Sequence, residues 1–336
     1  MNTEIIYDLT DENLNKAAEV IKKGGLVAFP TETVYGLGAN ALDPDAAKKI
    51  YSAKGRPSDN PLIIHLAIAE DADKYACTND VYYRLAEKFM PGPLTVIMQK
   101  RDNIPFEVTG GLESVAVRVP SDEIAHRFIS VCGVPIAAPS ANLSGKPSPT
   151  TTAHVIADMF SRIDMIIAGN KCDIGVESTI ISLCEEKPTL LRPGKITPEE
   201  LKTVCPDLEI AEAVLHRFEG RVQSPGMKYK HYAPRAKLEL LDGSSEQLVG
   251  FCSDKKDCGI LYYKEDKELQ NMPHSLCIGS RDDPCEQAHL LFENLRRFDE
   301  DEGITHIYAP LPSTDGVGLA VVNRLIRAAG FDVIKL

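Results

Sequence analysis

Short apolar runs alternate with amphipathic stretches over the first 205 residues of the chain. The runs are rich in β-branched residues and are bounded by Gly, Pro, Asn or Asp, as strands usually are. We predict strands at residues 26–29, 62–66, 95–99, 115–119, 135–138, 165–168, 179–183 and 190–191. We predict helices that follow Asp11 and stop at Gly24-Gly25, open at Asp43-Pro44 and stop at Gly55, and follow Ser121 and stop near Gly133. Strands that alternate with helices indicate an α/β domain with a mixed or parallel sheet.

The pattern changes after Cys205, where residues 206–237 become rich in proline and in basic side chains. From about Leu238 a second set of signals begins, with strands expected at 259–263 and 304–309 and helices at 284–298 and 318–329. We therefore predict an α/β domain over residues 1–205, a basic linker or lid over 206–237, and a smaller, doubly wound Rossmann-like α/β domain over 238–336.

Length and composition narrow the class of protein. The chain has 336 residues, of which 43% are hydrophobic and 26% charged, values that fit a globular protein and disfavour disorder or fibrous repeats. No window approaches the roughly 18 consecutive apolar residues that span a membrane, and the start Met1-Asn2-Thr3-Glu4 is unlike a signal peptide. Nine cysteines with no Cys-x-x-Cys pair disfavour structural zinc. We expect a cytoplasmic protein with no membrane role.

The charge distribution limits the possible partners. The net charge of −12 makes the chain a poor general binder of nucleic acid, because neutralised phosphates supply most non-specific affinity. Residues 224–237, in contrast, hold four Lys or Arg and no acid. Any site for a polyanion must therefore be local.

The common nucleotide-binding and hydrolase motifs do not occur. Gly145-Lys146 and Gly194-Lys195 lack the remaining residues of a phosphate loop, and Gly36-x-Gly38 lacks the third glycine of a dinucleotide fingerprint. The sequence also contains neither His-Glu-x-x-His nor Gly-x-Ser-x-Gly.

Four polar clusters instead lie next to predicted strands, where α/β proteins place ligands. The first, at residues 29–38, is a strand that runs into a turn rich in hydroxyls and glycines, which suits a small polar ligand but also suits an ordinary strand-to-helix turn. In the second, Lys54 and Arg56 are two residues apart, and on an extended chain they would project to one side as a paired cationic site for phosphate. Cations also gather at helix C-termini for structural reasons.

The third and fourth clusters also place polar residues on or at the end of a predicted strand, and each allows a structural or a ligand-binding role. An alternating strand places Ser114, Ala116 and Arg118 on one face, and an arginine inside an apolar run needs an anionic partner, either an acid of the protein or a ligand carboxylate. The fourth is a buried strand that ends in Ser140-x-Asn142, which either contacts a ligand or caps the turn.

Taken together, these motifs resemble the threonylcarbamoyl-adenylate synthase family. The residues that carry the resemblance are Lys54-x-Arg56 with Pro61-Leu62, Arg118-x-Pro120, Ser140-x-Asn142, Gly175-x-x-Ser178-Thr179-Ile180 and Leu191-Arg192-Pro193-Gly194. His231-Tyr232-Ala233-Pro234 and the additional C-terminal domain are similar to the long two-domain form. The resemblance implies a YrdC-like twisted mixed sheet with helices, followed by a C-terminal α/β domain.

The resemblance also implies a reaction. Such nucleotidyltransferases combine L-threonine, bicarbonate or carbon dioxide, and ATP into threonylcarbamoyl-AMP and pyrophosphate, for modification of the tRNA adenosine next to the anticodon. It implies Mg²⁺ with ATP, no tightly bound organic cofactor and no protein-held metal. The product would pass to a tRNA threonylcarbamoyl transferase complex, and a weak contact with tRNA is compatible with the resemblance.

The residues implied for each role follow from the matched motifs. L-Threonine would contact Thr33, His65, Arg118, Ala138 and Ser178, with Arg118 on its carboxylate. ATP would contact Arg56, Asn60, Ser114, Ser140, Asn142, Ser148, Arg192 and Tyr232. Lys54 and Arg56 would be the catalytic cations. A carbamate nucleophile is already anionic, so orientation and charge neutralisation suffice without a Ser-His-Asp arrangement.

Three alternatives stay open at this level. The chain could be a module for double-stranded RNA without chemistry, or an enzyme that transfers a carbamoyl group from carbamoyl phosphate. The C-terminal domain could support the lid, offer an interaction surface or hold a separate catalytic site. For residues 206–237, Lys228, Lys230, His231 and Arg235 surround two tyrosines, which predicts a lid over the ATP site in which Tyr232 contacts the nucleotide.

Overall fold

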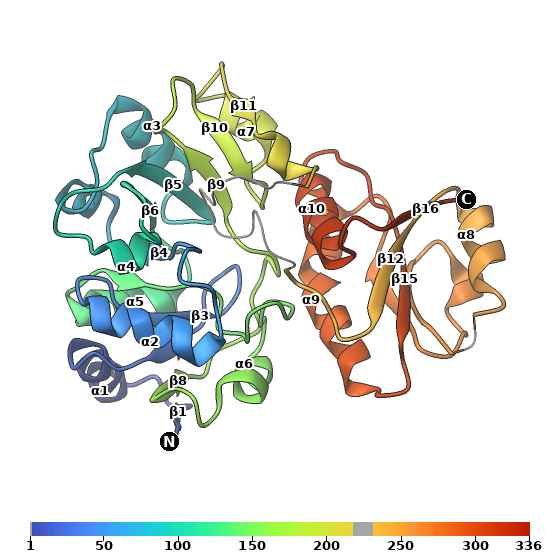
Figure 1. Cartoon of the computed structure of the whole chain (residues 1–336), viewed down its shortest axis with the longest axis horizontal. Coiled ribbons are helices and arrows are strands. Elements are labelled where there is room, and N and C mark those ends of the chain that lie inside the picture. The colour runs from blue at the N-terminus through green and yellow to red at the C-terminus, as the bar shows by residue number, and fades with distance from the viewer. Residues whose placement is uncertain (1, 218–230, 256) are drawn as a thin grey trace.

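Two sheets organise the chain, each within its own α/β domain (Figure 1). The computed structural model describes residues 2–217, 231–255 and 257–336. Strands from residues 4–210 form the first sheet, and strands from residues 237–335 form the second. The predicted lid residues Lys228 and Lys230 lie outside the described residues, so the lid stays a prediction, as do the domain boundaries at 205 and 237.

The first sheet has eleven strands in the order β1-β8-β2-β3-β7-β4-β6-β5-β9-β10-β11. Parallel pairs such as β4 with β6 and antiparallel pairs such as β5 with β6 both occur, so the mixed sheet is confirmed. The strands are β1 Glu4–Ile6, β2 Val27–Phe29, β3 Gly36–Asn40, β4 Ile63–His65, β5 Leu94–Gln99, β6 Ser114–Arg118, β7 Ile136–Ala137, β8 Met165–Ile167, β9 Thr179–Ser182, β10 Thr189–Arg192 and β11 Glu209–Ile210.

Helices cover both faces of this sheet. Leu14 and Ile21 of α1 and Phe128 of α5 pack with Phe29 in one core, whereas Ile50 of α2 and Leu85 of α3 pack with residues such as Ala28 in the other. Neighbouring residues of β2 thus point into opposite cores, as the alternation of a strand requires. The helices are α1 Asp11–Lys22, α2 Pro44–Lys54, η1 Ala69–Lys74, α3 Asp80–Phe89, α4 Phe106–Thr109, α5 Glu123–Cys132, α6 Thr152–Met159, α7 Pro198–Lys202 and η2 Glu212–Val214.

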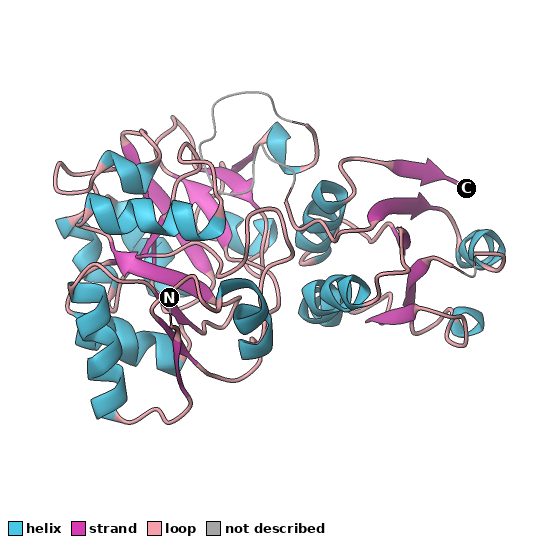
Figure 2. Cartoon of the chain, turned by 60° about the horizontal axis from the view of Figure 1, so that its bottom comes forward, coloured by secondary structure: helices cyan, strands magenta, loops and turns pink. Residues whose placement is uncertain are grey.

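The second sheet is entirely parallel, in the order β14-β13-β15-β12-β16. Helices α9 and α10 lie on the side that faces the first domain, and α8 lies on the outer side (Figures 1 and 2). The predicted doubly wound domain is therefore confirmed. Its elements are β12 Lys237–Asp242, α8 Ser245–Cys252, β13 Gly259–Tyr263, η3 Lys267–Leu269, β14 Ser275–Gly279, α9 Pro284–Glu300, β15 His306–Pro310, α10 Gly318–Ala328 and β16 Val333–Lys335.

Two details differ from the sequence predictions. Helix α1 begins at Asp11 and is capped by Thr10, and α5 begins at Glu123 and is capped by Asp122 instead of Ser121. In the polar cluster at 29–38, the turn ends at Tyr35, and Gly36 and Gly38 belong to strand β3. A Cβ atom on Gly38 would lie 2.8 Å from Ile136 and 3.0 Å from the Phe29 ring, so close packing explains this glycine.

No helix among the described residues is both long and apolar enough to span a membrane.

Candidate active site

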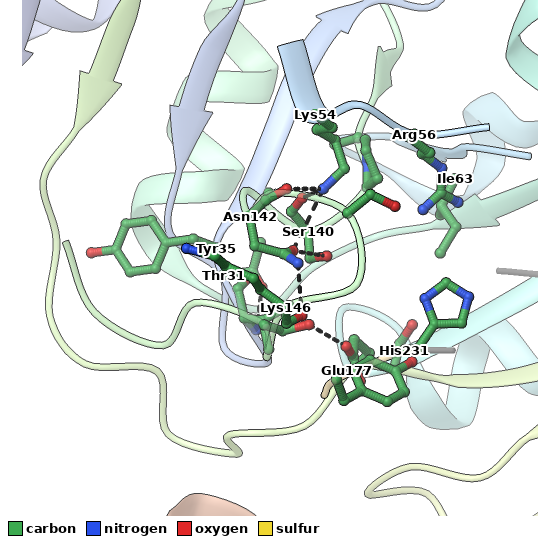
Figure 3. Close-up of a pocket in the computed structure, with 18 of the residues that line it drawn as sticks. Thr31, Tyr35, Lys54, Arg56, Ile63, Ser140, Asn142, Lys146, Glu177 and His231 are labelled. Carbon is green, nitrogen blue, oxygen red and sulfur yellow. Dashed lines mark hydrogen bonds between the residues drawn. The ribbon is translucent and has the colours of Figure 1, made fainter. Parts of the chain in front are cut away.

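A pocket that is partly open to solvent lies where the loops after β2 and β7 and the segment before β9 meet the ends of α2, β6 and β10 (Figure 3). Eleven of the fourteen predicted site residues line it. They are Lys54, Arg56, His65, Arg118, Ala138, Ser140, Asn142, Ser148, Ser178, Arg192 and Tyr232. The fold therefore brings together motifs that are spread over most of the first domain and reach into the segment that follows it.

Lys54 and Arg56 stand at the C-terminus of helix α2. The predicted extended backbone is wrong here, because Lys54 is the last helical residue and Gly55 adopts a left-handed conformation with φ of 61° as the C-cap. This cap turns the chain so that both cations still reach the pocket. Arg56 is oriented by hydrogen bonds from its Nε to the carbonyl of Asn60 (3.2 Å) and from its Nη2 to that of Pro61 (3.0 Å).

The ammonium group of Lys54 connects α2 to the loop after β7. Its Nζ donates to the carbonyl oxygens of Ser140 and Asn142, the latter at 2.6 Å, and lies 3.5 Å from Asn142 Oδ1, as the dashed lines in Figure 3 indicate. Burial, together with the neighbouring Arg56, lowers the pKa of Lys54 well below its usual value. Three oxygen acceptors oppose that shift, since they match the three donors of a protonated lysine.

The loop after β7 is ordered by the side chain of Asn142. Its Oδ1 accepts from Ser140 Oγ at 2.5 Å, and its Nδ2 donates to the carbonyls of Leu143 (2.8 Å) and Lys146 (2.9 Å). Asn142 therefore performs the turn-capping role considered for it, and Ser140 and Asn142 also line the pocket.

Arg118 has an acid of the protein as its partner. Its Nη2 lies 2.8 Å from Oε1 of Glu32, and both side chains are almost fully buried. Arg118 Nε, however, has no hydrogen-bond partner among the described residues. The guanidinium is thus charge-compensated while it keeps donor capacity for a second anion.

His65 lies beside Arg118 because β4 and β6 are paired in parallel register. Burial, with a smaller contribution from the Arg118 charge, lowers the pKa of His65 to about 3. The ring is therefore neutral at physiological pH and adds no positive charge to this end of the pocket.

Ser178, which precedes β9, and Arg192, at the end of β10, also line the pocket. The Ser178 hydroxyl bonds to Thr95 Oγ1 at 2.8 Å and accepts from Arg192 Nη2 at 3.2 Å, and Arg192 Nε donates to the Ser178 carbonyl at 3.0 Å. Burial lowers the pKa of Arg192 to about 10, so this residue remains a cation at neutral pH.

Three predicted residues are not among those that line the pocket. Thr33 is fully buried behind it, with its hydroxyl 2.8 Å from that of Thr31, which does line the pocket. Asn60 is also fully buried, and its side-chain amide has no partner among the described residues. Ser114 lies at the other end of β6 from Arg118 and borders a separate hollow with Gln99.

Two acids of the site had no role in the sequence analysis. Glu32 lies within the first polar cluster, and Glu177 lies within the Gly175-x-x-Ser178 motif and lines the pocket. Ser148 Oγ donates to Glu177 Oε1. The available signal was an acid placed two residues before the apolar strand β9. No group of three or more His, Cys, Asp or Glu side chains suited to a metal ion occurs in the described part of the chain.

Comparisons with known proteins agree with this architecture. A family model described as "Telomere recombination" matches residues 19–194, and one described as "Threonylcarbamoyl-AMP synthase, C-terminal domain" matches residues 196–330. The chain is 45% identical to the threonylcarbamoyl-AMP synthase of Pyrococcus abyssi, over 95% of each chain, and 43% identical to that of Bacillus subtilis, over 98% of each.

A solved structure extends the likeness to three dimensions. The crystal structure of P. abyssi Sua5 complexed with L-threonine has a TM-score of 0.90 and 42% identity, and covers 100% of this chain and 99% of that one. This match spans both domains, so the expected YrdC-like domain followed by a C-terminal α/β domain is confirmed. The chain therefore belongs to the threonylcarbamoyl-AMP synthase family, in its two-domain form.

Proposed function

We propose that this chain makes threonylcarbamoyl-AMP from L-threonine, bicarbonate or carbon dioxide, and ATP, with release of pyrophosphate. The observation that carries the proposal is one pocket in which a buried arginine with a spare donor, Arg118, lies beside three further cations, Lys54, Arg56 and Arg192. The first arginine suits the carboxylate of an amino acid, and the other cations suit a triphosphate.

L-Threonine would bind at the Arg118 end of the pocket. The threonine complex of the P. abyssi protein supports this substrate. Arg118 Nε would donate to the carboxylate, and the neutral His65 and the Ser178 hydroxyl would offer polar contacts to the rest of the amino acid, near Thr33 and Ala138. Because His65 is neutral, it places no positive charge beside the amine of the bound threonine.

ATP would bind toward Arg56 and Arg192. Ser140, Asn142 and Ser148 would offer polar contacts along the loop after β7, with Tyr232 beside them. Neither Asn60 nor Ser114 lines the pocket, so these two residues would act on ATP only through the residues that do. Mg²⁺ would be held mainly by the triphosphate, and the hydroxyl and amide oxygens of this loop suit a hydrated ion.

The chemistry requires little beyond orientation. The threonine amine adds to carbon dioxide and loses a proton to give a carbamate, and a carbamate oxygen then attacks the α-phosphorus and displaces pyrophosphate. Lys54 and Arg56 would be placed to neutralise charge on the phosphates as the new bond forms. The product would serve a tRNA threonylcarbamoyl transferase complex, which modifies the adenosine next to the anticodon.

Mass analysis of the products tests this proposal. With ATP, Mg²⁺, bicarbonate and L-threonine, we expect threonylcarbamoyl-AMP and an equal amount of pyrophosphate, and we expect neither when threonine or bicarbonate is omitted. An Arg56→Ala variant should fold normally and release much less pyrophosphate. Equal pyrophosphate release without threonine would exclude the mechanism, and product formation from carbamoyl phosphate in place of bicarbonate would favour carbamoyl transfer.

A further inference from the structure

The C-terminal domain contributes a fully buried arginine to the surroundings of the pocket. Arg324 belongs to α10, which lies on the side of the C-terminal domain that faces the first domain (Figure 1), and its side chain is 0% exposed. Its Nε donates to Oε2 of Glu177 at 2.7 Å, and its Nη2 donates to the Glu177 carbonyl at 3.3 Å. Glu177 lines the pocket (Figure 3), so Arg324 of the second domain contacts a residue of the pocket directly.

Glu177 is an unusual group for a phosphate site. Its other carboxylate oxygen accepts a hydrogen bond from Ser148, one of the residues implied for ATP. Burial alone would raise the pKa of Glu177, but the charges of Arg324 and Arg192 outweigh it and lower the pKa, so the group is ionised at neutral pH. An uncompensated carboxylate at this point would repel a triphosphate, since charges in a poorly solvated pocket interact strongly.

The same arginine also contacts Tyr232. The Arg324 guanidinium lies 5.6 Å from the centre of the Tyr232 ring, and the Phe292 ring of α9 stacks on that tyrosine at 5.2 Å with 30° between the planes. Two helices of the C-terminal domain therefore hold a pocket residue whose positive φ of 64° is uncommon for tyrosine.

We propose that Arg324 is a positioning residue that completes the ATP part of the pocket from the C-terminal domain, by compensating the charge of Glu177 and fixing its carboxylate against Ser148. This inference rests on the proposed function for the location of ATP. It assigns to the C-terminal domain a part in nucleotide binding that acts through Glu177, distinct from the support of a lid. It also predicts that neutralising Arg324 weakens ATP binding, whereas neutralising Glu177 does not.

Calorimetric measurement of the Kd for ATP with Mg²⁺, without threonine or bicarbonate, tests the proposal. Arg324→Met removes the ion-pair partner of Glu177, one of the two cations that compensate its charge, and should raise this Kd about tenfold or more. Glu177→Gln still accepts from Ser148 and should leave the ATP Kd unchanged or lower it. The double variant E177Q/R324M should recover ATP binding relative to R324M. The Kd for L-threonine should change much less than that for ATP in R324M.

Arg281→Met is the matched control. Arg281 pairs with the buried carboxylate of Asp266 at 3.1 Å within the C-terminal domain, and neither residue is among those that line the pocket. This variant should lose stability while it keeps the ATP Kd. A folded R324M that binds ATP as the wild type does would overturn the proposal.

The remaining outcomes are also decisive. If R324M does not fold, E177Q decides alone, because weakened ATP binding in that variant contradicts the charge argument. A wild-type protein that binds ATP but releases no pyrophosphate would refute the proposed reaction and leave the comparison of Kd values valid. A wild-type protein that does not bind ATP at all would overturn both.

Discussion

Arg118 and Glu32 form a buried pair whose charges are matched but whose hydrogen bonds are incomplete. A guanidinium that is 5% exposed needs an opposite charge, which Glu32 supplies at 2.8 Å. The arrangement leaves Arg118 Nε and both Glu32 oxygens without a well-aligned hydrogen bond among the described residues. Glu32 thus compensates the charge of Arg118 but does not satisfy all of its hydrogen-bond donors. A ligand carboxylate would accept the missing hydrogen bond from Arg118.

Replacing Arg118 with alanine should therefore weaken L-threonine binding far more than ATP binding. We expect a loss of about 2–5 kcal/mol for threonine, because one partner of a buried charge pair is removed. Calorimetric Kd values for each ligand measure the difference. Arg127→Ala, a change of a half-exposed arginine paired with Asp11, is the control.

The R118A variant also leaves Glu32 buried without a partner, which could impair folding. The double variant E32Q/R118A removes both charges and should show the same selective loss of threonine affinity. A folded variant with wild-type threonine affinity would refute the role of Arg118.

Residue chemistry explains what the sequence could predict about the site. Lys54, Arg56, Arg118 and Arg192 are cations in motifs at the ends of predicted elements, and all four line the pocket. The acid that partners Arg118 was not predictable, because Glu32 reaches it only through the folded sheet. Glu177 was missed for the same reason, since its partner Arg324 belongs to the other domain.

At the scale of elements, the close approach of strands β9 and β10 positions Arg192 in the lining of the pocket. Strands β9 and β10 are antiparallel neighbours, and Gly194 follows β10 where it passes the start of β9. A Cβ atom on Gly194 would lie 2.5 Å from the backbone nitrogen of Thr179 and 2.8 Å from the carbonyl of Glu177. This close passage holds Arg192 against Ser178, so the glycine supports the geometry of the pocket.

Gly194→Ala should reduce both stability and ATP affinity. The added methyl group must displace the backbone at Glu177 and Thr179, and hence the bonds from Arg192 to Ser178. Gly133→Ala is a useful comparison, because Gly133 caps α5 with φ of 65° and its Cβ would meet nothing within 4 Å. That change should cost about 1–2 kcal/mol of folding stability through backbone strain alone.

Urea unfolding and ATP Kd values separate the two glycine variants. We expect a larger loss of stability in G194A and a change of Kd only in G194A. Equal losses of stability with normal ATP binding in both would show that the passage of β10 over β9 does not shape the pocket.

The element predictions succeeded where local pattern decides structure. The β-branched runs of β4, β5, β6 and β9 were predicted to within one residue or so. Strand β3 was missed as a strand because its glycines carry no strand preference, and it forms through its partners β2 and β7. The short edge strand β1 depends likewise on pairing with β8.

On the scale of the whole molecule, the two domains share a buried seam. Val34 and Val176 of the first domain belong to the same apolar cluster as the core of the C-terminal domain. The ion pairs Glu177–Arg324 and Asp158–Arg296 cross this seam. Sequence patterns could indicate two domains but not this contact, because the residues that meet there lie far apart along the chain.

Buried histidines couple the stability of the whole molecule to pH. Burial lowers the pKa of His65 to about 3, of His154 to about 4 and of His231 to about 3. The unfolded chain takes up protons on these rings near pH 6.5, whereas the folded protein does not until the pH approaches the lowered pKa values. The free energy of unfolding should therefore fall as the pH drops from 7 toward 4.

His154 allows this prediction to be tested outside the pocket, since it does not line the pocket and its Nδ1 accepts from the Thr150 amide at 3.3 Å. At pH 5.5, His154 should account for at most about 1.4 kcal/mol of the lost free energy of unfolding, because solvent screens a half-buried ring. Urea unfolding at pH 7.5 and 5.5 should show a smaller loss of stability on acidification for His154→Gln than for the wild type. Equal losses in the two proteins would mean that His154 takes up its proton as readily in the folded chain as in the unfolded one.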